Sequence, residues 1–252
     1  MKAMVFAAGI GSRLRPFTLS HPKALAPVAG VPALERVLLH LRDAGVSRVV
    51  VNVHHFASQI RDFLADNRNF SLDIAVSDES DTLLDTGGGL LKAIPFLDDA
   101  TEDPILLHNA DIVTDFPIGE MLAAHNETHA DVTLLTSSRE SSRNLWFDSC
   151  GCLHGWSNVK TGEVRPAGAS LSCMSPAAFG GVHIISPSVF SLLKDYGSTL
   201  AADGVVKPFS LVPFYLDVMD KIDIRPFTPA GAFRWFDIGS PEKLAAASKS
   251  FG

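Results

Sequence analysis

The sequence has little cysteine and no long apolar run. Its three cysteines in 252 residues are an odd number without a secretory context, which argues against a disulfide framework. No segment holds the roughly 18 uninterrupted apolar residues that a membrane-spanning helix needs. The opening MKAMVFAAG also reaches glycine and arginine too early for a signal peptide. We therefore expect a cytoplasmic protein without a membrane partner.

Negative charge is missing from the N-terminal stretch, although the whole chain carries a formal net charge of -7. The first acidic residue is Glu35, whereas Lys2, Arg13, Arg15 and Lys23 come before it. An acidic chain with one basic loop lacks the spread basic face that is typical of nucleic-acid and anionic-membrane binders. The pattern instead indicates that this loop binds a small anionic ligand.

The cysteines could belong to a zinc site. Cys150, Cys152, His154 and Cys173 offer four zinc ligands, but their C-x-C spacing differs from the usual C-x2-C knuckle. The string FDSCGCLHGW is more simply two short strands joined at 149–151. We therefore expect ordinary buried or surface thiols.

Apolar runs alternate with amphipathic stretches along the first half of the chain. With 46% hydrophobic and 19% charged residues, the composition is that of a globular protein with a sizeable core. The pattern predicts strands at 4–7, 48–53, 72–76, 105–108 and 130–136, and helices at 32–44, 57–65 and 90–96. Such alternation predicts an α/β fold, with a Rossmann-like mixed, mostly parallel sheet flanked by helices.

The second half of the chain is less regular. It predicts a hairpin around Gly151, a loop at 158–175, strands at 179–185 and 222–227, and helices at 187–194, 209–219 and 241–250. No break in composition marks a linker. We therefore expect a single domain over residues 1–252, with the second half forming one wall of a cleft.

The basic loop FAAGIGSRLRPFTLSHPKALAPVAG, at 6–30, matches neither of two common phosphate-binding loops. A Walker A loop needs a lysine that is absent after these glycines, and the Rossmann fingerprint needs a third glycine where Leu14 stands. What remains is a glycine turn at the carboxyl end of the first strand, where open α/β sheets bind ligands. Gly9 and Gly11 let the backbone approach a phosphate, and Arg13 and Lys23 follow on a proline-stiffened arm.

Two aspartates come at the ends of predicted strands. Asp111 ends an apolar strand, and Asp237 follows Trp235 and Phe236. Carboxylates at one sheet edge can share a Mg²⁺ ion, which takes hard oxygen ligands and commonly only one or two carboxylates beside phosphates and waters. Taken alone, Asp237 fits a turn or cap equally well, because Gly239 follows it closely.

Several segments of the sequence resemble one enzyme family. AAGIGSRLRPFT followed by HPKALAPVAGVPALE resembles the A-A-G-x-G-[ST]-R-[LM]-x-P-x-T and P-K-x-L-x-P-[VI] signature of the sugar-1-phosphate nucleotidyltransferases, or nucleotide-sugar pyrophosphorylases. LLDTGGGLLKAIPFL, LLHNADIVTD, AFGGVHIISPSVF and WFDIGSPEKLAAA resemble further segments of that family in the same order. The short length, the D-T-G-G-G string and the F-x-G-[IV]-x-[IV] strand look most like the N-acetylmuramate-1-phosphate uridylyltransferases within it.

The resemblance implies a fold, a reaction and a set of site residues. The fold is that of the nucleotide-diphospho-sugar transferases, with 1–137 as the nucleotide-binding half and 138–252 as the sugar-binding half. The reaction is a Mg²⁺-dependent condensation of a nucleoside triphosphate, here UTP, with a sugar 1-phosphate, here N-acetylmuramate 1-phosphate, which releases pyrophosphate. By resemblance, Arg13 holds the departing pyrophosphate, Lys23 bridges the reacting phosphates, and the metal is bound by Asp111 and Asp237. The implied nucleotide-binding residues are Ala7, Ala8, Gly9, Gly11, Ser12, Arg13, Gly87 and Gly88, and the implied sugar-binding residues are Asn109 and Gly181.

Other functions stay open at this point. WSNVKTGE does not supply the E-K-P motif with which larger members contact the sugar, so the sugar is not fixed. The chain shows no hexapeptide repeats, so we expect no added acyltransferase activity. The alternatives are a transferase for another nucleotide or for phosphocholine, and a non-catalytic nucleotide-sugar sensor. Against the sensor, all four charged residues expected for catalysis are present. The pattern does not indicate an oligomeric state.

Overall fold

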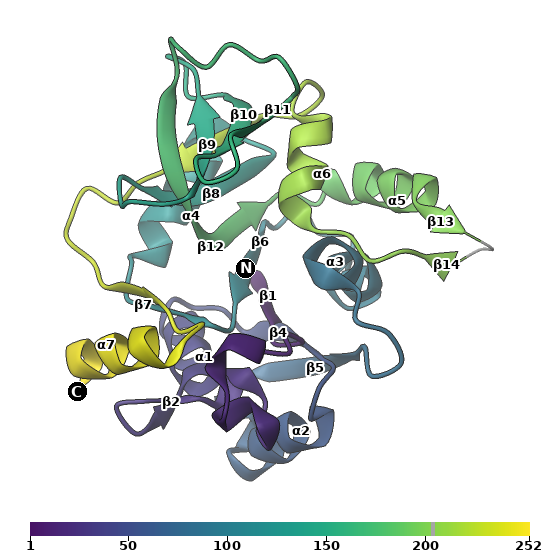
Figure 1. The fold of residues 1–252 in the computed structure, drawn as a ribbon. Coiled ribbons are helices and arrows are strands. Elements are labelled where there is room, and N and C mark those ends of the chain that lie inside the picture. Colours follow the sequence, from purple (N-terminus) through teal and green to yellow (C-terminus); the bar gives the residue numbers. More distant parts are fainter. Residues whose placement is uncertain (203–204) are drawn as a thin grey trace.

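A ten-stranded mixed sheet forms the centre of the computed structural model, which describes residues 1–202 and 205–252 (Figure 1). Its parallel part has the strand order β6-β1-β4-β5. These strands are β1 (Lys2–Phe6), β4 (Arg48–Val53), β5 (Asp73–Asp78) and β6 (Ile105–Asn109). Because they run parallel, their carboxyl ends meet at one edge of the sheet.

The second half of the chain extends this sheet, mainly with antiparallel strands. β12 pairs with β6, β8 and β9, and β15 pairs in parallel with β8. The strands are β8 (Val132–Ser137), β9 (Arg143–Phe147), β10 (Leu153–Asn158), β11 (Glu163–Arg165), β12 (Ser175–Ile185) and β15 (Ile224–Phe227). The predicted hairpin around Gly151 is confirmed as β9 and β10. The segment 158–175, predicted as a loop, contains β11.

Helices cover both faces of the sheet. One face packs against α1 (Ala33–Asp43), α2 (Ala57–Asp66) and α4 (Ile118–Thr128), and the other against α3 (Asp85–Leu97), α5 (Val189–Thr199) and α6 (Leu211–Val218). Ala3 and Val5 of β1 lie in the first hydrophobic cluster and Met4 in the second, because successive strand side chains point to opposite faces. The predicted fold class is therefore confirmed.

Two helices differ from the sequence prediction. The helix predicted at 90–96 begins at Asp85, so the glycines 87–89 lie inside α3 and not before it. The pattern gives no prediction for α4, because IGEMLAAHNET buries only Ile118, Met121 and His125 and so has a weak apolar stripe. The helix predicted at 209–219 is shorter at both ends.

Smaller elements complete the fold. The proline-stiffened loop after β1 contains 3-10 turns at Ser12–Leu14, Phe17–Leu19 and Lys23–Leu25. Short antiparallel pairs join β2 (Pro27–Val28) to β3 (Val31–Pro32), β7 (Ile112–Thr114) to β16 (Trp235–Asp237), and β13 (Ala201–Ala202) to β14 (Val205–Val206). The C-terminal α7 (Pro241–Phe251) packs on the pair β7 and β16 (Figure 1). None of the helices in the described ranges is long and apolar enough to cross a membrane.

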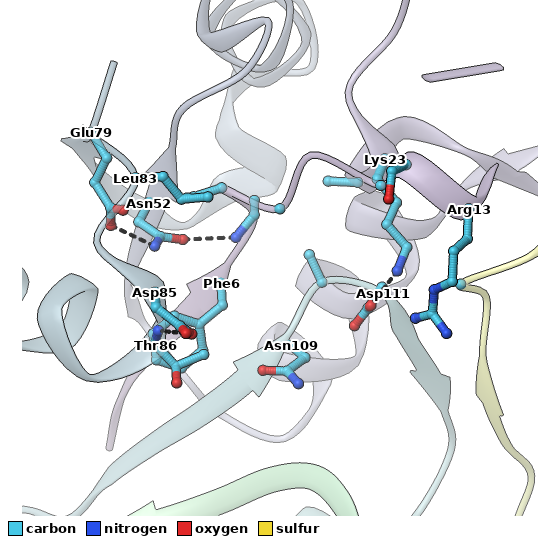
Figure 2. A pocket seen from close by; sticks show the side chains of 18 of the residues that line it. Phe6, Arg13, Lys23, Asn52, Glu79, Leu83, Asp85, Thr86, Asn109 and Asp111 are labelled. Carbon is cyan, nitrogen blue, oxygen red and sulfur yellow. Dashed lines mark hydrogen bonds and ion pairs between the residues drawn. The ribbon is translucent and has the colours of Figure 1, made fainter. Parts of the chain in front are cut away.

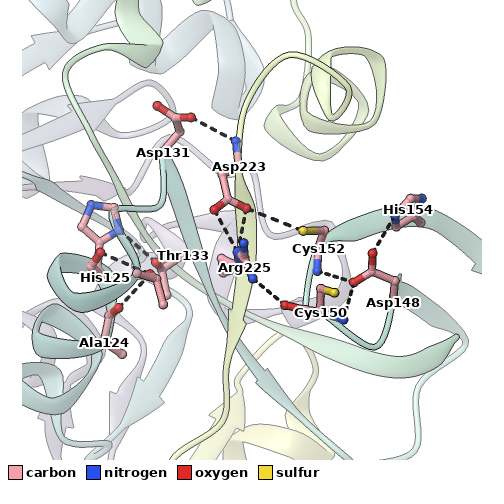
Figure 3. A network of polar contacts seen from close by, with 11 residues as sticks. Ala124, His125, Asp131, Thr133, Asp148, Cys150, Cys152, His154, Asp223 and Arg225 are labelled. Atoms are coloured by element: carbon pink, nitrogen blue, oxygen red, sulfur yellow. Dashed lines mark hydrogen bonds and ion pairs between the residues drawn. The ribbon is translucent and has the colours of Figure 1, made fainter.

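The tip of the β9–β10 hairpin is held by a polar network (Figure 3). One oxygen of Asp148 accepts the backbone N–H groups of Cys150, at 2.9 Å, and Cys152, at 2.8 Å. Arg225 of β15 donates to both oxygens of Asp223 and to the carbonyl of Cys150. All three thiols of the chain are free, and the described residues hold no group of three His, Cys, Asp or Glu that suits a metal ion. The network therefore ties the turn of the hairpin to β15.

Candidate active site

The basic loop folds back on itself directly after β1. Gly11 has φ of +67°, and a Cβ at that position would lie 2.9 Å from Cβ of Lys23 and 2.9 Å from Cγ2 of Thr18. Thr18 Oγ1 also donates to the carbonyl of Gly11 at 2.9 Å. Only glycine fits both the left-handed backbone and this close approach. The fold of the loop thus places Lys23 beside the glycine turn.

A cavity of about 470 Å³ opens at the carboxyl ends of β1, β4 and β6. The structure brings nine of the predicted site residues to its wall, and Figure 2 shows several of them around the opening. They are Ala7, Ala8, Gly9, Gly11, Ser12, Arg13, Lys23, Asn109 and Asp111. This position is the one expected for a ligand of an open α/β sheet.

Asp111 and Asp237 lie side by side, although they are far apart in the sequence. Asp237 is opposite Ile112 in the pairing of β16 with β7, and the N–H of Ile238 donates to the carbonyl of Asp111 at 2.9 Å. Lys23 donates from Nζ to the Asp111 carboxylate. The predicted neighbourhood of the two carboxylates and the basic loop is therefore present in the structure.

Gly239 marks the point where these charged groups converge. A Cβ on Gly239 would lie 2.7 Å from Oδ1 of Asp237, 3.1 Å from Nη2 of Arg13 and 3.4 Å from Nζ of Lys23. The N–H of Gly239 also donates to Oδ1 of Asp237 at 2.8 Å. The absence of a side chain at this position lets two cations and a carboxylate meet.

Asp237 is held in its ionised form. Burial alone would raise the pKa of its carboxyl group, but the ammonium groups of Lys243 and Lys23 lower it below the ordinary value. Lys243 Nζ lies 2.5 Å from Oδ2 of Asp237. The Asp111 carboxylate pairs with the ammonium group of Lys23, and the Asp237 carboxylate with that of Lys243. The two carboxylates thus provide hard oxygen ligands at a position with negative charge. This set fits Mg²⁺, which needs few protein ligands when phosphates and waters supply the rest.

The side of the cavity predicted to bind the nucleotide contains a buried network that the sequence did not predict (Figure 2). Asn52 Oδ1 accepts the N–H of Ala7 at 2.7 Å, and its Nδ2 donates to Oε1 of Glu79 at 2.7 Å. The second oxygen of Glu79 accepts the N–H of Leu84 at 3.1 Å. Burial raises the pKa of Glu79, although these hydrogen bonds oppose the shift. Asn52 is a polar residue inside the apolar strand RVVVNV. A buried polar side chain needs a hydrogen-bond partner, so this position could have indicated the network from the sequence.

Four other cavity-lining residues were not among the predicted site residues, and two of them, Asp85 and Thr86, begin α3 directly before the predicted glycines. They are Leu83, Asp85, Thr86 and Pro208. Asp85 has φ of +60°, and its carboxylate accepts from Ser210 Oγ at 2.5 Å. A non-glycine residue in this backbone region is uncommon and favours a functional position.

The predicted nucleotide-binding glycines have a different environment. Gly87 and Gly88 are buried in α3 and donate their N–H groups to the carbonyl of Phe209, at 2.8 and 3.2 Å. A Cβ on Gly87 would lie 2.3 Å from the ring of Phe209. Close packing of α3 on the 209 segment is therefore a structural reason for Gly87, and contact with a nucleobase stays a prediction.

The two predicted sugar-side residues lie next to each other. Gly181 of β12 has φ of +73°, and a Cβ there would lie 3.0 Å from Nδ2 of Asn109 and 2.9 Å from Cγ1 of Ile112. Asn109 lines the cavity, whereas Gly181 lies behind the Asn109 side chain. The glycine therefore gives Asn109 the room it needs.

Comparison with known proteins agrees with this geometry. Residues 2–145 match the family model of the nucleotidyl transferases. The chain is 38% identical to an N-acetylmuramate alpha-1-phosphate uridylyltransferase of Neisseria meningitidis serogroup B, over 100% of this chain and 99% of that protein. It is 32% identical to the protein of the same description from Caulobacter vibrioides, over 98% and 96% of the two chains.

Solved structures show the same fold at lower sequence identity. A putative glucose-1-phosphate thymidylyltransferase from Bacillus anthracis, crystallised with sucrose, superimposes with a TM-score of 0.79 at 16% identity. That match covers 99% of this chain and 94% of the other. The resemblance noted in the motifs is thus confirmed over the full length, and the chain belongs to the nucleotidyl transferase family, among its sugar-1-phosphate nucleotidyltransferases.

Proposed function

We propose that this protein transfers uridylyl from UTP to N-acetylmuramate 1-phosphate and releases pyrophosphate. The single observation that carries the chemistry is the convergence of Asp111, Asp237, Arg13 and Lys23 around Gly239, at the end of a cavity large enough for a nucleotide. The choice of substrates is supported by the names of the two full-length relatives. In this proposal 1–137 is the nucleotide-binding half of a single domain, and 138–252 is the sugar-binding half.

The reaction is a direct displacement at phosphorus. A phosphate oxygen of the sugar 1-phosphate forms a bond to the α-phosphorus of UTP, and the bond from that phosphorus to the bridging oxygen of pyrophosphate breaks. The attacking group is already an anion, so no side chain has to remove a proton or form a covalent intermediate. The protein has mainly to align two anions and offset their repulsion.

The basic residues have distinct positions for this task. Arg13 follows the glycine turn and, in our proposal, contacts the pyrophosphate as negative charge develops on it. Lys23 bridges the α-phosphate and the incoming sugar phosphate, exchanging its contact with Asp111 for contacts with substrate. Both are on a loop fixed by the close contact of Gly11 with Lys23 and Thr18, which positions them before substrate binds.

Asp111 and Asp237 are the residues that would hold Mg²⁺. When bound, the ion would offset negative charge on the phosphates of both substrates. The two carboxylates keep their positions through the backbone hydrogen bond between Ile238 and Asp111 and through the N–H of Gly239. Lys243 pairs with Asp237 and holds its carboxylate beside Gly239, which lines the cavity.

The nucleobase end of the site is assigned to the cavity wall beyond Ala7 and Ala8. Asn52 accepts the Ala7 N–H and so helps to hold the backbone of this turn in position for the nucleotide. Glu79 in turn fixes Asn52 and Leu84. These two side chains are positioning residues in our proposal, because their polar atoms are used on protein groups.

A release assay for pyrophosphate tests this function. The purified protein is mixed with Mg²⁺, one of UTP, CTP, GTP or dTTP, and one of N-acetylmuramate 1-phosphate, N-acetylglucosamine 1-phosphate, glucose 1-phosphate or phosphocholine. We expect the highest kcat/KM for UTP with N-acetylmuramate 1-phosphate. A preference for another pair would replace the proposed substrates, and ligand binding without pyrophosphate release for every pair would show a sensor instead of an enzyme.

A further inference from the structure

An arginine outside the phosphate-binding loop packs on Trp235 of β16 and is close enough to Asp237 to be affected by its charge. Arg139 follows β8, and its guanidinium carbon lies 4.1 Å from the centroid of the Trp235 ring. Its Nη2 donates to the carbonyl of Phe179 at 2.7 Å. The Trp235 indole in turn donates to the carbonyl of Gly180 at 2.8 Å. The guanidinium plane is thus fixed by a ring and a backbone acceptor on two different strands.

The surroundings of Arg139 connect it with the sugar-side residues. Trp235 and Asp237 are two residues apart in β16, so their side chains project to the same face of that strand. Gly180 precedes Gly181, which packs against Asn109. Burial lowers the pKa of Arg139, and the nearby Asp237 carboxylate opposes this shift. Arg139 therefore shares the electrostatic environment of the reacting groups.

Among the residues that the structure describes, no carboxylate forms an ion pair with Arg139. In the described part of the chain, no Asp or Glu oxygen lies within 4.0 Å of its nitrogens. Asp237 is paired with Lys243 and Asp111 with Lys23. A guanidinium has five N–H donors, and within the described ranges Arg139 makes one hydrogen bond. The remaining donors have the fork geometry that binds a carboxylate with two parallel hydrogen bonds.

The acceptor substrate offers a matching group only in some of the sugars that this family uses. Glucose and mannose 1-phosphates carry negative charge on the phosphate alone. N-acetylmuramate 1-phosphate carries a second anion, the carboxylate of its lactyl ether. In the proposed function Arg13 and Lys23 contact the reacting phosphates, and both line the cavity. Arg139, beside the sugar-side residues, is then available for a second anion on the sugar.

We propose that Arg139 is a specificity-determining residue, which binds a carboxylate carried by the sugar ring of the acceptor substrate. This inference rests on the proposed function, because it concerns the acceptor of that same reaction. The Trp235 ring holds the guanidinium in place and leaves its outer N–H groups for the lactyl carboxylate. A purely structural role for Arg139 would be to hold Trp235 against β12. The two roles differ in which acceptor substrates lose kcat/KM when Arg139 is replaced.

The test compares two acceptors that differ only in the lactyl ether. With UTP as the nucleotide, kcat/KM is measured for N-acetylmuramate 1-phosphate and for N-acetylglucosamine 1-phosphate. For an acceptor that reacts too slowly, its inhibition constant against the faster acceptor is measured instead. The variants are Arg139→Met, which keeps the stem, and Arg139→Lys, which keeps the charge. Arg143→Met serves as the matched control, since this exposed arginine also has no carboxylate within 4.0 Å in the described ranges.

We expect Arg139→Met to weaken use of N-acetylmuramate 1-phosphate by about tenfold to a hundredfold, the usual range for a lost hydrogen bond to a charged group. N-acetylglucosamine 1-phosphate should change less than about threefold, and Arg139→Lys should restore part of the loss. Equal losses for both acceptors, or none, would overturn the inference and leave Arg139 a clamp for Trp235. If the wild-type protein itself does not use N-acetylmuramate 1-phosphate, the proposed function fails instead, which separates the two outcomes.

Discussion

Gly239 offers the sharpest perturbation of the site, because one methyl group would reach three charged side chains. In Gly239→Ala the new Cβ would lie 2.7 Å from Oδ1 of Asp237, whereas ordinary contact begins at 3.4 Å. The oxygen must therefore move by about 0.7 Å, the difference between these two distances. The methyl group would also crowd Nη2 of Arg13, at 3.1 Å, and reach Nζ of Lys23, at 3.4 Å.

The expected result is a loss of activity without a comparable loss of stability. Displacing reacting groups by up to about 1 Å commonly costs about a hundredfold in rate, which is about 2.7 kcal/mol in the barrier. All three contacts involve the ends of flexible side chains, and Gly239 is not at a positive φ, so the methyl group can be accommodated. Alanine also restricts the unfolded chain, which offsets part of any strain. We expect the free energy of unfolding to change by less than about 1 kcal/mol.

Steady-state pyrophosphate release and urea denaturation measure the two quantities. Gly231→Ala is the matched control, because a Cβ on this exposed glycine meets nothing within 4 Å. If Gly239→Ala keeps the kcat/KM of the wild-type protein, or loses no more than Gly231→Ala, then the charged groups around Gly239 are not the reacting centre.

Further predictions concern packing and pH. Gly87→Ala would place a Cβ 2.3 Å from the ring of Phe209. We expect this variant to lower the free energy of unfolding, measured by urea denaturation, by about 1–3 kcal/mol. Unchanged stability with a raised KM for UTP would instead support the predicted nucleobase contact. Burial lowers the pKa of His108 and of His183 to about 3, so the unfolded chain binds protons that the folded chain does not. Stability should therefore fall as the pH drops below about 6.5 toward 3, with a contribution of up to about 1.4 kcal/mol per pH unit from each histidine. In urea denaturation at pH 6.5, 5.5 and 4.5, His183→Leu should show a shallower fall than the wild-type protein, and an equal slope would contradict the buried neutral state.

The sequence predicted the parts of the site that local patterns determine. Asp111 stands at the end of an apolar strand, and a strand end in a parallel sheet is enough to place its carboxylate at the ligand-binding edge. Gly11 and Lys23 were recognisable because glycine turns and basic residues suit phosphates. The fold class followed from the alternation of apolar runs with amphipathic helices, and the structure confirms it.

Other features depend on contacts between distant segments. Asp237 pairs with the Asp111 region through β7 and β16, strands of three residues each that are too short for a periodic signal. The predicted helix at 90–96 left out the glycines 87–89, because glycine weakens a helix, yet these glycines lie in α3, where a side chain on Gly87 would not fit beside Phe209. Glu79 has no distinctive neighbours in the sequence, and only the fold places it against Asn52.

The central claim is that Asp111 and Asp237 together bind the cation that lets the two phosphates react. Its most direct test is the rate of pyrophosphate release as a function of Mg²⁺ concentration, for the wild-type protein, Asp111→Asn, Asp237→Asn and the neighbouring control Asp115→Asn, whose carboxylate pairs with Arg234. We predict that each of the first two variants loses about a hundredfold or more in rate and requires more Mg²⁺, while the control does neither. A wild-type rate and Mg²⁺ midpoint in either Asp111→Asn or Asp237→Asn would contradict the claim.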